Sequence, residues 1–207
     1  NRSNKSYYNI QFVFDDMPNV HLPFDYDTYQ KYSKNVYAAV TNLNTGKTEY
    51  LNIPGDDKSW AVLIATCALP ILFQPVKIGN NLYMDGGITD SVPIEKALSD
   101  GCTKNLVILT REKNYIKKEE PALKLAAFKY RKYPLFTQAL KARTENYNQS
   151  HRRLLELEQE GKAFIIAPQN TAGWRRTESD PRKLKKMYDD GFRFVKENLN
   201  QIKAYAT

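Results

Sequence analysis

Short β-prone blocks, separated by turn-forming residues, make up much of the first half of the chain. Two such runs, 36–41 and 47–53, flank "NLNTG" and predict a β-hairpin. The stretch "QPVKIGNNLYMDGG" has the same arrangement, with "GNN" at its tip, and predicts a second hairpin. Between the hairpins, the run 60–69 predicts a helix that Ser59 caps and Pro70 stops.

Helical patterns and two short apolar runs fill the second half. A helix is predicted in "SVPIEKALSDG", where Pro93 suits the first turn and Gly101 the C-terminal cap. The runs "KNLVILT" and "AFIIAP" are typical of strands buried on both faces, as in parallel sheets. Residues 121–160 are predicted to be mostly helical with a break near Pro134, and 181–199 to form a final amphipathic helix.

The alternation of strands and helices predicts an α/β fold, in which helices cover a central, mostly parallel sheet. In the Tyr- and Asp-rich N-terminal region, "NIQFVFDDMPN" predicts a short strand or a turn of helix. No internal repeat, low-complexity tract or linker interrupts the sequence. We therefore expect a single domain over 1–207, with 121–207 as its mainly helical C-terminal part.

The formal net charge of +8 favours anionic partners such as nucleic acid, phospholipid head groups or acidic substrates, although a basic solvated surface is the more common meaning. No nucleic-acid-binding motif accompanies the charge, so we expect no nucleic-acid partner. Cys67 and Cys102 lack metal-site spacing and fit reduced thiols in the cytoplasm. No apolar run approaches the roughly 20 residues that cross a bilayer. A cytoplasmic protein with peripheral contact to anionic membrane fits this composition.

The candidate chemistry centres on Asp85, which directly follows the apolar residues 82–84 and precedes a glycine pair. Taken alone, Asp-Gly-Gly closes a turn, with Asp bonding local amides and the glycines adopting positive φ. A carboxylate at a strand end also lies where α/β proteins place their sites, and a glycine pair lets a backbone or ligand approach. A metal site shared with Asp90 is disfavoured, because the spacing gives no cation cage and no His lies nearby.

Other polar residues are expected to have structural roles. His21 and His151 lie far apart in the sequence, and no Gly-x-Ser-x-Gly elbow supplies the nucleophile of a Ser-His-Asp triad. Cys67 is expected in the core rather than as a nucleophile. We expect the next helix to be started and capped by Thr89, Asp90 and Ser91. Asp90 is also a candidate for orienting the Asp85 carboxylate.

An ordered set of motifs resembles the C-terminal catalytic segment of the patatin-like phospholipase family. The set comprises "ALP" before an apolar stretch, "PVKI" ahead of a Gly-Asn turn, "YMDGG", and "VPIEKA" followed by Gly and a strand. Further matches in "PFDYDTY", "TNLNTGKTEY", "YNQ" and "IIAP" resemble a bacterial branch of the family. The resemblance extends over nearly the whole chain.

This resemblance implies a cofactor-independent serine hydrolase that acts on acyl esters or phospholipids with a Ser–Asp pair. Asp85 matches the family's proton acceptor, and Gly86 and Gly87 would shape its turn. The family's serine stands in Gly-x-Ser-x-Gly after a Gly-rich oxyanion loop, and neither motif occurs in these 207 residues. We therefore expect the N-terminal part of the fold to be missing and the chain to be inactive alone. The alternatives are a non-catalytic lipid- or partner-binding fragment and a structural remnant that self-associates through an exposed sheet edge.

Overall fold

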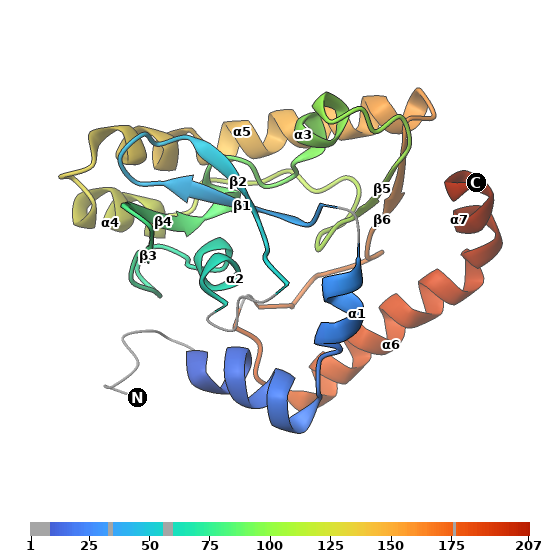
Figure 1. Cartoon of the computed structure of the whole chain (residues 1–207). Helices are drawn as coiled ribbons and strands as arrows, with labels where there is room; N and C mark the ends of the chain where they lie inside the picture. The colour runs from blue at the N-terminus through green and yellow to red at the C-terminus, as the bar shows by residue number, and fades with distance from the viewer. Residues whose placement is uncertain (1–8, 33–34, 56–59, 176) are drawn as a thin grey trace. The chain divides into compact units, whose positions relative to one another are not determined.

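The computed structural model describes residues 9–32, 35–55, 60–175 and 177–207 (Figure 1). These residues fall into two compact units. Unit 1 comprises Asn1–Val92 and Lys118–Tyr147, and unit 2 comprises Pro93–Lys117 and Asn148–Thr207. The single domain over 1–207 stays a prediction.

Unit 1 contains a four-stranded antiparallel sheet in the order β2-β1-β4-β3. Both predicted hairpins are confirmed, with Gly46 (φ 63°) and Gly79 (φ 58°) supplying the left-handed turn positions. Consecutive strands joined by such short turns must run antiparallel. The strands are β1 (Tyr37–Asn42), β2 (Thr48–Asn52), β3 (Val76–Ile78) and β4 (Asn81–Asp85).

Helices cover both faces of this sheet (Figure 1). Ala65 on helix α2 (Ala61–Thr66) packs with Val40 and Tyr83. The neighbouring Met84 points to the opposite face, because successive strand side chains alternate. There it joins a larger core with residues of α4 (Ala122–Lys129) and of the first part of α5 (Pro134–Gln159). The largest fully buried side chains of this core are Leu43, Met84, Ile88, Phe136 and Leu140.

The N-terminal part of unit 1 is helical, which confirms the second of the two predicted alternatives. A π-helix spans Phe12–His21 and includes Pro18, and α1 follows at Tyr26–Lys31. The helix predicted over 60–69 is shorter than expected: it begins at Ala61, because Trp60 has a left-handed φ of 54°, and it ends at Thr66, before the predicted stop at Pro70. Its expected cap, Ser59, lies outside the described residues.

Unit 2 contains the parallel part of the fold. Strand β5 (Asn105–Ile108) pairs in parallel with β6 (Ala163–Ile166), as the two apolar runs predicted. The expectation that both faces are buried is wrong for β5, because Leu106 and Ile108, which share one face of the strand, are exposed. The helices of unit 2 are α3 (Ile94–Ser99), the second part of α5, α6 (Pro181–Glu197) and α7 (Leu199–Ala206).

The α/β class is confirmed, but the expected central sheet is corrected. Its larger sheet is antiparallel, since two tight hairpins supply its four strands, and only the β5–β6 pair is parallel among the described strands. The final helix predicted over 181–199 is divided at Asn198. The backbone N–H of Asn198 (3.1 Å) and its side-chain amide (2.8 Å) both donate to the Phe194 carbonyl, and the φ of −101° and ψ of 8° at Asn198 end the first helix there.

Candidate active site

Asp85 is the last residue of β4, and its main chain is held on two sides. Its N–H donates to the carbonyl of Ala68 at 3.0 Å. Its own carbonyl accepts from the Thr41 hydroxyl, Oγ1, at 2.8 Å. Thr41 belongs to β1, where Val40 is the register partner of Asp85. The backbone of Asp85 is therefore fixed between the end of α2 and the central strand of the sheet.

The carboxylate of Asp85 is oriented by its own turn. Its Oδ1 accepts from the N–H of Gly87 at 2.7 Å, and this bond caps the short 3-10 turn Gly86–Ile88. Hydrogen bonds to an ionised carboxylate are short and stronger than neutral ones. The side chain is half-buried. The bond from Gly87 fixes the orientation of the carboxylate relative to the turn.

Gly86 and Gly87 are needed for space. A Cβ on Gly86 would lie 2.1 Å from the carbonyl oxygen of Ala39, and a Cβ on Gly87 would lie 2.9 Å from Asp85 Oδ1. Neither glycine has a positive φ, so that part of the turn interpretation is wrong. The expected close approach of another backbone is confirmed, because β1 passes directly against Gly86.

Arg143 on α5 holds the other side of the turn. Its Nε donates to the Gly87 carbonyl at 2.9 Å, and the same oxygen accepts from Ser91 Oγ at 2.8 Å. One guanidinium nitrogen of Arg143 also pairs with Glu120 at 2.8 Å. Arg143 is only 8% exposed. Both backbone polar groups of Gly87 are thus hydrogen-bonded, the N–H to Asp85 and the carbonyl to Arg143 and Ser91.

The role of Arg143 was missed in the sequence. A usable signal was present, since Phe136, Leu140 and Arg143 share the core-facing stripe of the helix at helical spacing. An arginine on an apolar stripe must find buried partners, because an unpaired buried charge is costly. That spacing predicts a buried ion pair of Arg143 but does not identify the turn that Arg143 contacts.

Comparison with known families places this turn in a described domain. Residues 12–98 match the family described as Patatin-like phospholipase. Over these residues the chain is similar to the patatin-like family. Residues 133–207 match a domain of unknown function (DUF6363). No curated protein matches the chain at a significant level. The patatin-like segment contains Asp85, both glycines and all four strands of the antiparallel sheet.

The residues after the patatin-like Asp-Gly-Gly turn do not cap the next helix as expected. Helix α3 begins after Pro93 without a side-chain cap. Ser91 instead donates to Gly87, and Asp90 accepts from the Tyr50 hydroxyl. Thr89 forms a hydroxyl cluster, with Thr41 Oγ1 at 2.9 Å and Thr48 Oγ1 at 2.7 Å. These side chains tie the turn to β1 and β2. The idea that Asp90 orients Asp85 stays a prediction.

Cys67 lies beside the patatin-like Asp85, and the expectation of a core position is wrong. The residue follows α2 and is exposed overall. Local burial of the thiol raises the pKa of Cys67, and the nearby negative charge of Asp85 raises this pKa further. A raised pKa disfavours the thiolate, which is the nucleophilic form of cysteine. The environment of Cys67 therefore argues against a nucleophilic role.

The two histidines have different environments. His21 is exposed at the end of the N-terminal π-helix, and its ring centroid lies 5.6 Å from that of Phe12. His151 is buried on α5, and burial lowers its pKa. Among the described residues, no group of three or more His, Cys, Asp or Glu side chains could hold a metal ion. Within the same residues, none of the helices is both long and apolar enough to cross a membrane.

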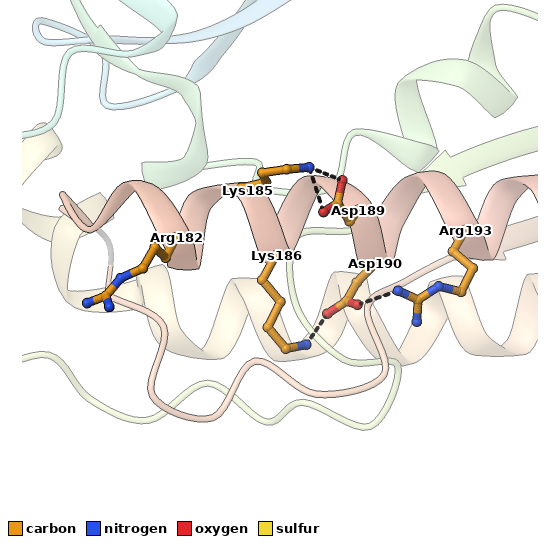
Figure 2. A pocket seen from close by; sticks show the side chains of 6 residues that line it. All are labelled: Arg182, Lys185, Lys186, Asp189, Asp190 and Arg193. Atoms are coloured by element: carbon orange, nitrogen blue, oxygen red, sulfur yellow. Dashed lines mark hydrogen bonds and ion pairs between the residues drawn. The ribbon is translucent and has the colours of Figure 1, made fainter.

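A shallow pocket on α6 is a charged helix surface. Figure 2 shows Lys185 paired with Asp189, and Asp190 between Lys186 and Arg193. The acids are already paired with bases of the same helix, and the side chains are largely solvated. This pocket offers no group held for catalysis. Its lining residues are Arg182, Lys185, Lys186, Asp189, Asp190 and Arg193.

Proposed function

We propose that Asp85 is the general base of a Ser–Asp lipid acyl hydrolase. A patatin-like phospholipase segment indicates a lipid hydrolase family in general. The observation that carries the proposal is the Asp85 carboxylate, held at 2.7 Å by the Gly87 N–H in a rigid turn of that segment. Substrates of this reaction would be acyl esters, including phospholipids, and it needs no cofactor.

The reaction proceeds in two steps. Asp85 takes the proton of a serine hydroxyl while the serine oxygen attacks the ester carbonyl, because a hydroxyl is a poor nucleophile until a base removes its proton. The tetrahedral oxyanion collapses, and the alcohol leaves with the proton that Asp85 returns. In the second step Asp85 deprotonates water, which attacks the acyl-serine. The carboxylic acid is released and the serine recovers its proton.

The serine is the part of this mechanism that the 207 residues do not supply, since they contain no Gly-x-Ser-x-Gly motif. We therefore propose that these residues alone are inactive on esters. Hydrolysis is expected only when they are joined to a segment that carries the nucleophile elbow and the Gly-rich oxyanion loop.

The test replaces Asp85 by Asn in a protein that contains both the elbow and these residues. The expected loss in kcat on a short-chain nitrophenyl ester is about 10²- to 10⁴-fold, the usual contribution of a general base. Asp100→Asn is the matched control, because Asp100 pairs with Lys96 on α3. Near wild-type turnover by Asp85→Asn would show that the base is assigned wrongly.

A second candidate function is non-catalytic binding to lipid. The net charge of +8 and an exposed apolar face on α6 favour it. In this form the chain is a cytoplasmic protein that contacts an anionic membrane surface peripherally. Such attraction weakens as ionic strength rises. Vesicle sedimentation in low and high salt tests this, and salt-independent absence of binding would count against it.

A further inference from the structure

One face of α6 is apolar and exposed. Leu184, Tyr188, Phe192 and Val195 follow one another at intervals of four, four and three positions, which places them on one side of a helix. All four are exposed, and no residue of α6 is buried. The rings of Tyr188 and Phe192 stack with centroids 6.2 Å apart. We call these four residues the α6 stripe.

Charged side chains occupy the rest of the helix surface, with basic residues in excess. Figure 2 shows part of this polar face, where Lys185 and Lys186 each reach toward an aspartate one turn further on. The helix carries six basic and three acidic residues, so its net charge is +3. Its basic residues are Arg182, Lys183, Lys185, Lys186, Arg193 and Lys196.

We infer that α6 lies in the head-group region of an anionic lipid bilayer, with the α6 stripe turned toward the acyl chains. A strong apolar face, a Lys- and Arg-rich polar face and low overall hydrophobicity are the signature of helices that lie in the membrane interface. With 17 residues the helix is about 26 Å long and presents its stripe along that length.

Charge complementarity identifies the occupant of this face. A second copy of the chain would bring another helix of net positive charge against the first, which repels. Anionic lipid instead supplies negative head groups beside the basic residues and hydrocarbon beneath the stripe. The inference rests on α6 alone, so it holds or fails independently of Asp85 and the proposed hydrolase.

The experiment is co-flotation of the 207-residue chain with vesicles. Pure phosphatidylcholine is compared with phosphatidylcholine containing about 30% phosphatidylglycerol. The chain is expected to float with the anionic vesicles, less so in raised salt, and to stay in solution with the neutral ones. Equal binding to neutral vesicles, or no binding to anionic vesicles, would overturn the inference.

Paired variants locate the contact. Tyr188→Ser with Phe192→Ser removes two side chains that are 69% and 60% exposed, and is expected to weaken anionic vesicle binding at least about tenfold. The matched control is Phe128→Ser with Leu125→Ser on α4, where the exposures are 67% and 60%. This control should bind like the unmodified chain. An equal loss in both pairs would show that general surface apolarity, and not α6, is responsible.

Charge and folding are controlled separately. Arg182→Gln with Lys196→Gln should weaken binding about fivefold per residue at low salt. Gly191→Ala favours helix formation at an open position, so it should leave binding unchanged or stronger. Circular dichroism verifies that each variant keeps its helix content. If the α6 stripe variant binds vesicles normally but converts a dimer to a monomer in gel filtration, a second copy covers the stripe and the inference is wrong.

Discussion

At the scale of single residues, two features of the neighbouring glycines set the position of the Asp85 carboxylate: a donated N–H and a missing side chain. Gly87 donates its N–H to the carboxylate, and Gly86 has no side chain to keep β1 away. The hydroxyl of Thr41, on β1, then reaches the Asp85 carbonyl. A base in this setting keeps one orientation, which is what proton abstraction at hydrogen-bond distance requires.

Two glycine-to-alanine substitutions should have opposite effects on stability. Gly86→Ala places a methyl group 2.1 Å from the Ala39 carbonyl oxygen, so β1 and the turn must separate. We expect a loss of about 3 kcal/mol in the free energy of unfolding. Gly191→Ala meets no atom within 4 Å inside α6 and should add about 0.5–1 kcal/mol. Urea unfolding measures both, and equal midpoints would contradict the steric role of Gly86.

Cys67 provides a probe of the charge on Asp85. Burial is the larger cause of the raised pKa of Cys67, and the Asp85 charge is the second. Asp85→Asn should therefore lower this pKa partway toward its usual value and increase thiolate at a given pH. The measurement is the rate of alkylation against pH in a Cys102→Ser background. Asp100→Asn serves as the control, and a pH profile unmoved by Asp85→Asn would contradict the electrostatic contact.

The turn formed by Asp85 and its glycines can be predicted from the sequence, because the three residues are adjacent and the turn is local. Arg143 lies 56 positions beyond Gly87 and reaches it only after α5 has packed on the sheet. The prediction of positive φ for the glycines is wrong, because Gly86 is required for the close approach of β1 and not for its backbone angle. That approach depends on where β1 passes.

At the scale of elements, Arg143 connects α5 to the turn after β4 through its hydrogen bond to Gly87. Arg143→Met keeps most of the side-chain length but leaves Glu120 and the Gly87 carbonyl without their cationic partner. We expect a loss of about 3 kcal/mol in the free energy of unfolding. Arg153→Met on the same helix removes a half-exposed surface network and should cost less than about 1 kcal/mol.

Denaturant unfolding of both arginine variants provides this comparison. Glu120→Gln combined with Arg143→Met should recover part of the loss, because the buried charge is then removed together with its partner. Equal costs for Arg143→Met and Arg153→Met would contradict a structural role of Arg143 at the turn.

The sequence predicts elements well where a local signal exists. Both hairpins follow from their turn residues, and the helices before and after Pro134 follow from periodicity and the proline itself. The arrangement of strands is harder to predict, because pairing between β1 and β4 joins segments on either side of α2. Exposure of β5 likewise depends on what covers each face of its sheet, and the apolar run itself does not encode that.

At the scale of the whole molecule, the chain combines a patatin-like segment over residues 12–98 with the domain of unknown function over 133–207. The first contains the candidate base, and the second contains α6 with its exposed stripe. We propose a division of labour in which one part carries the acid–base chemistry and the other part binds the lipid surface. Vesicle binding and ester hydrolysis should then be lost through different substitutions.

The role of Asp85 is tested most directly by the rate at which a fluorophosphonate labels the nucleophilic serine, in a protein that contains both groups. Labelling reports activation of the serine without the later steps of turnover. With Asp85→Asn the rate should fall by about 10²-fold or more, while Asp100→Asn labels like the unmodified protein. Labelling of Asp85→Asn at the unmodified rate, in a protein that keeps its unfolding midpoint, would show that Asp85 is not the base.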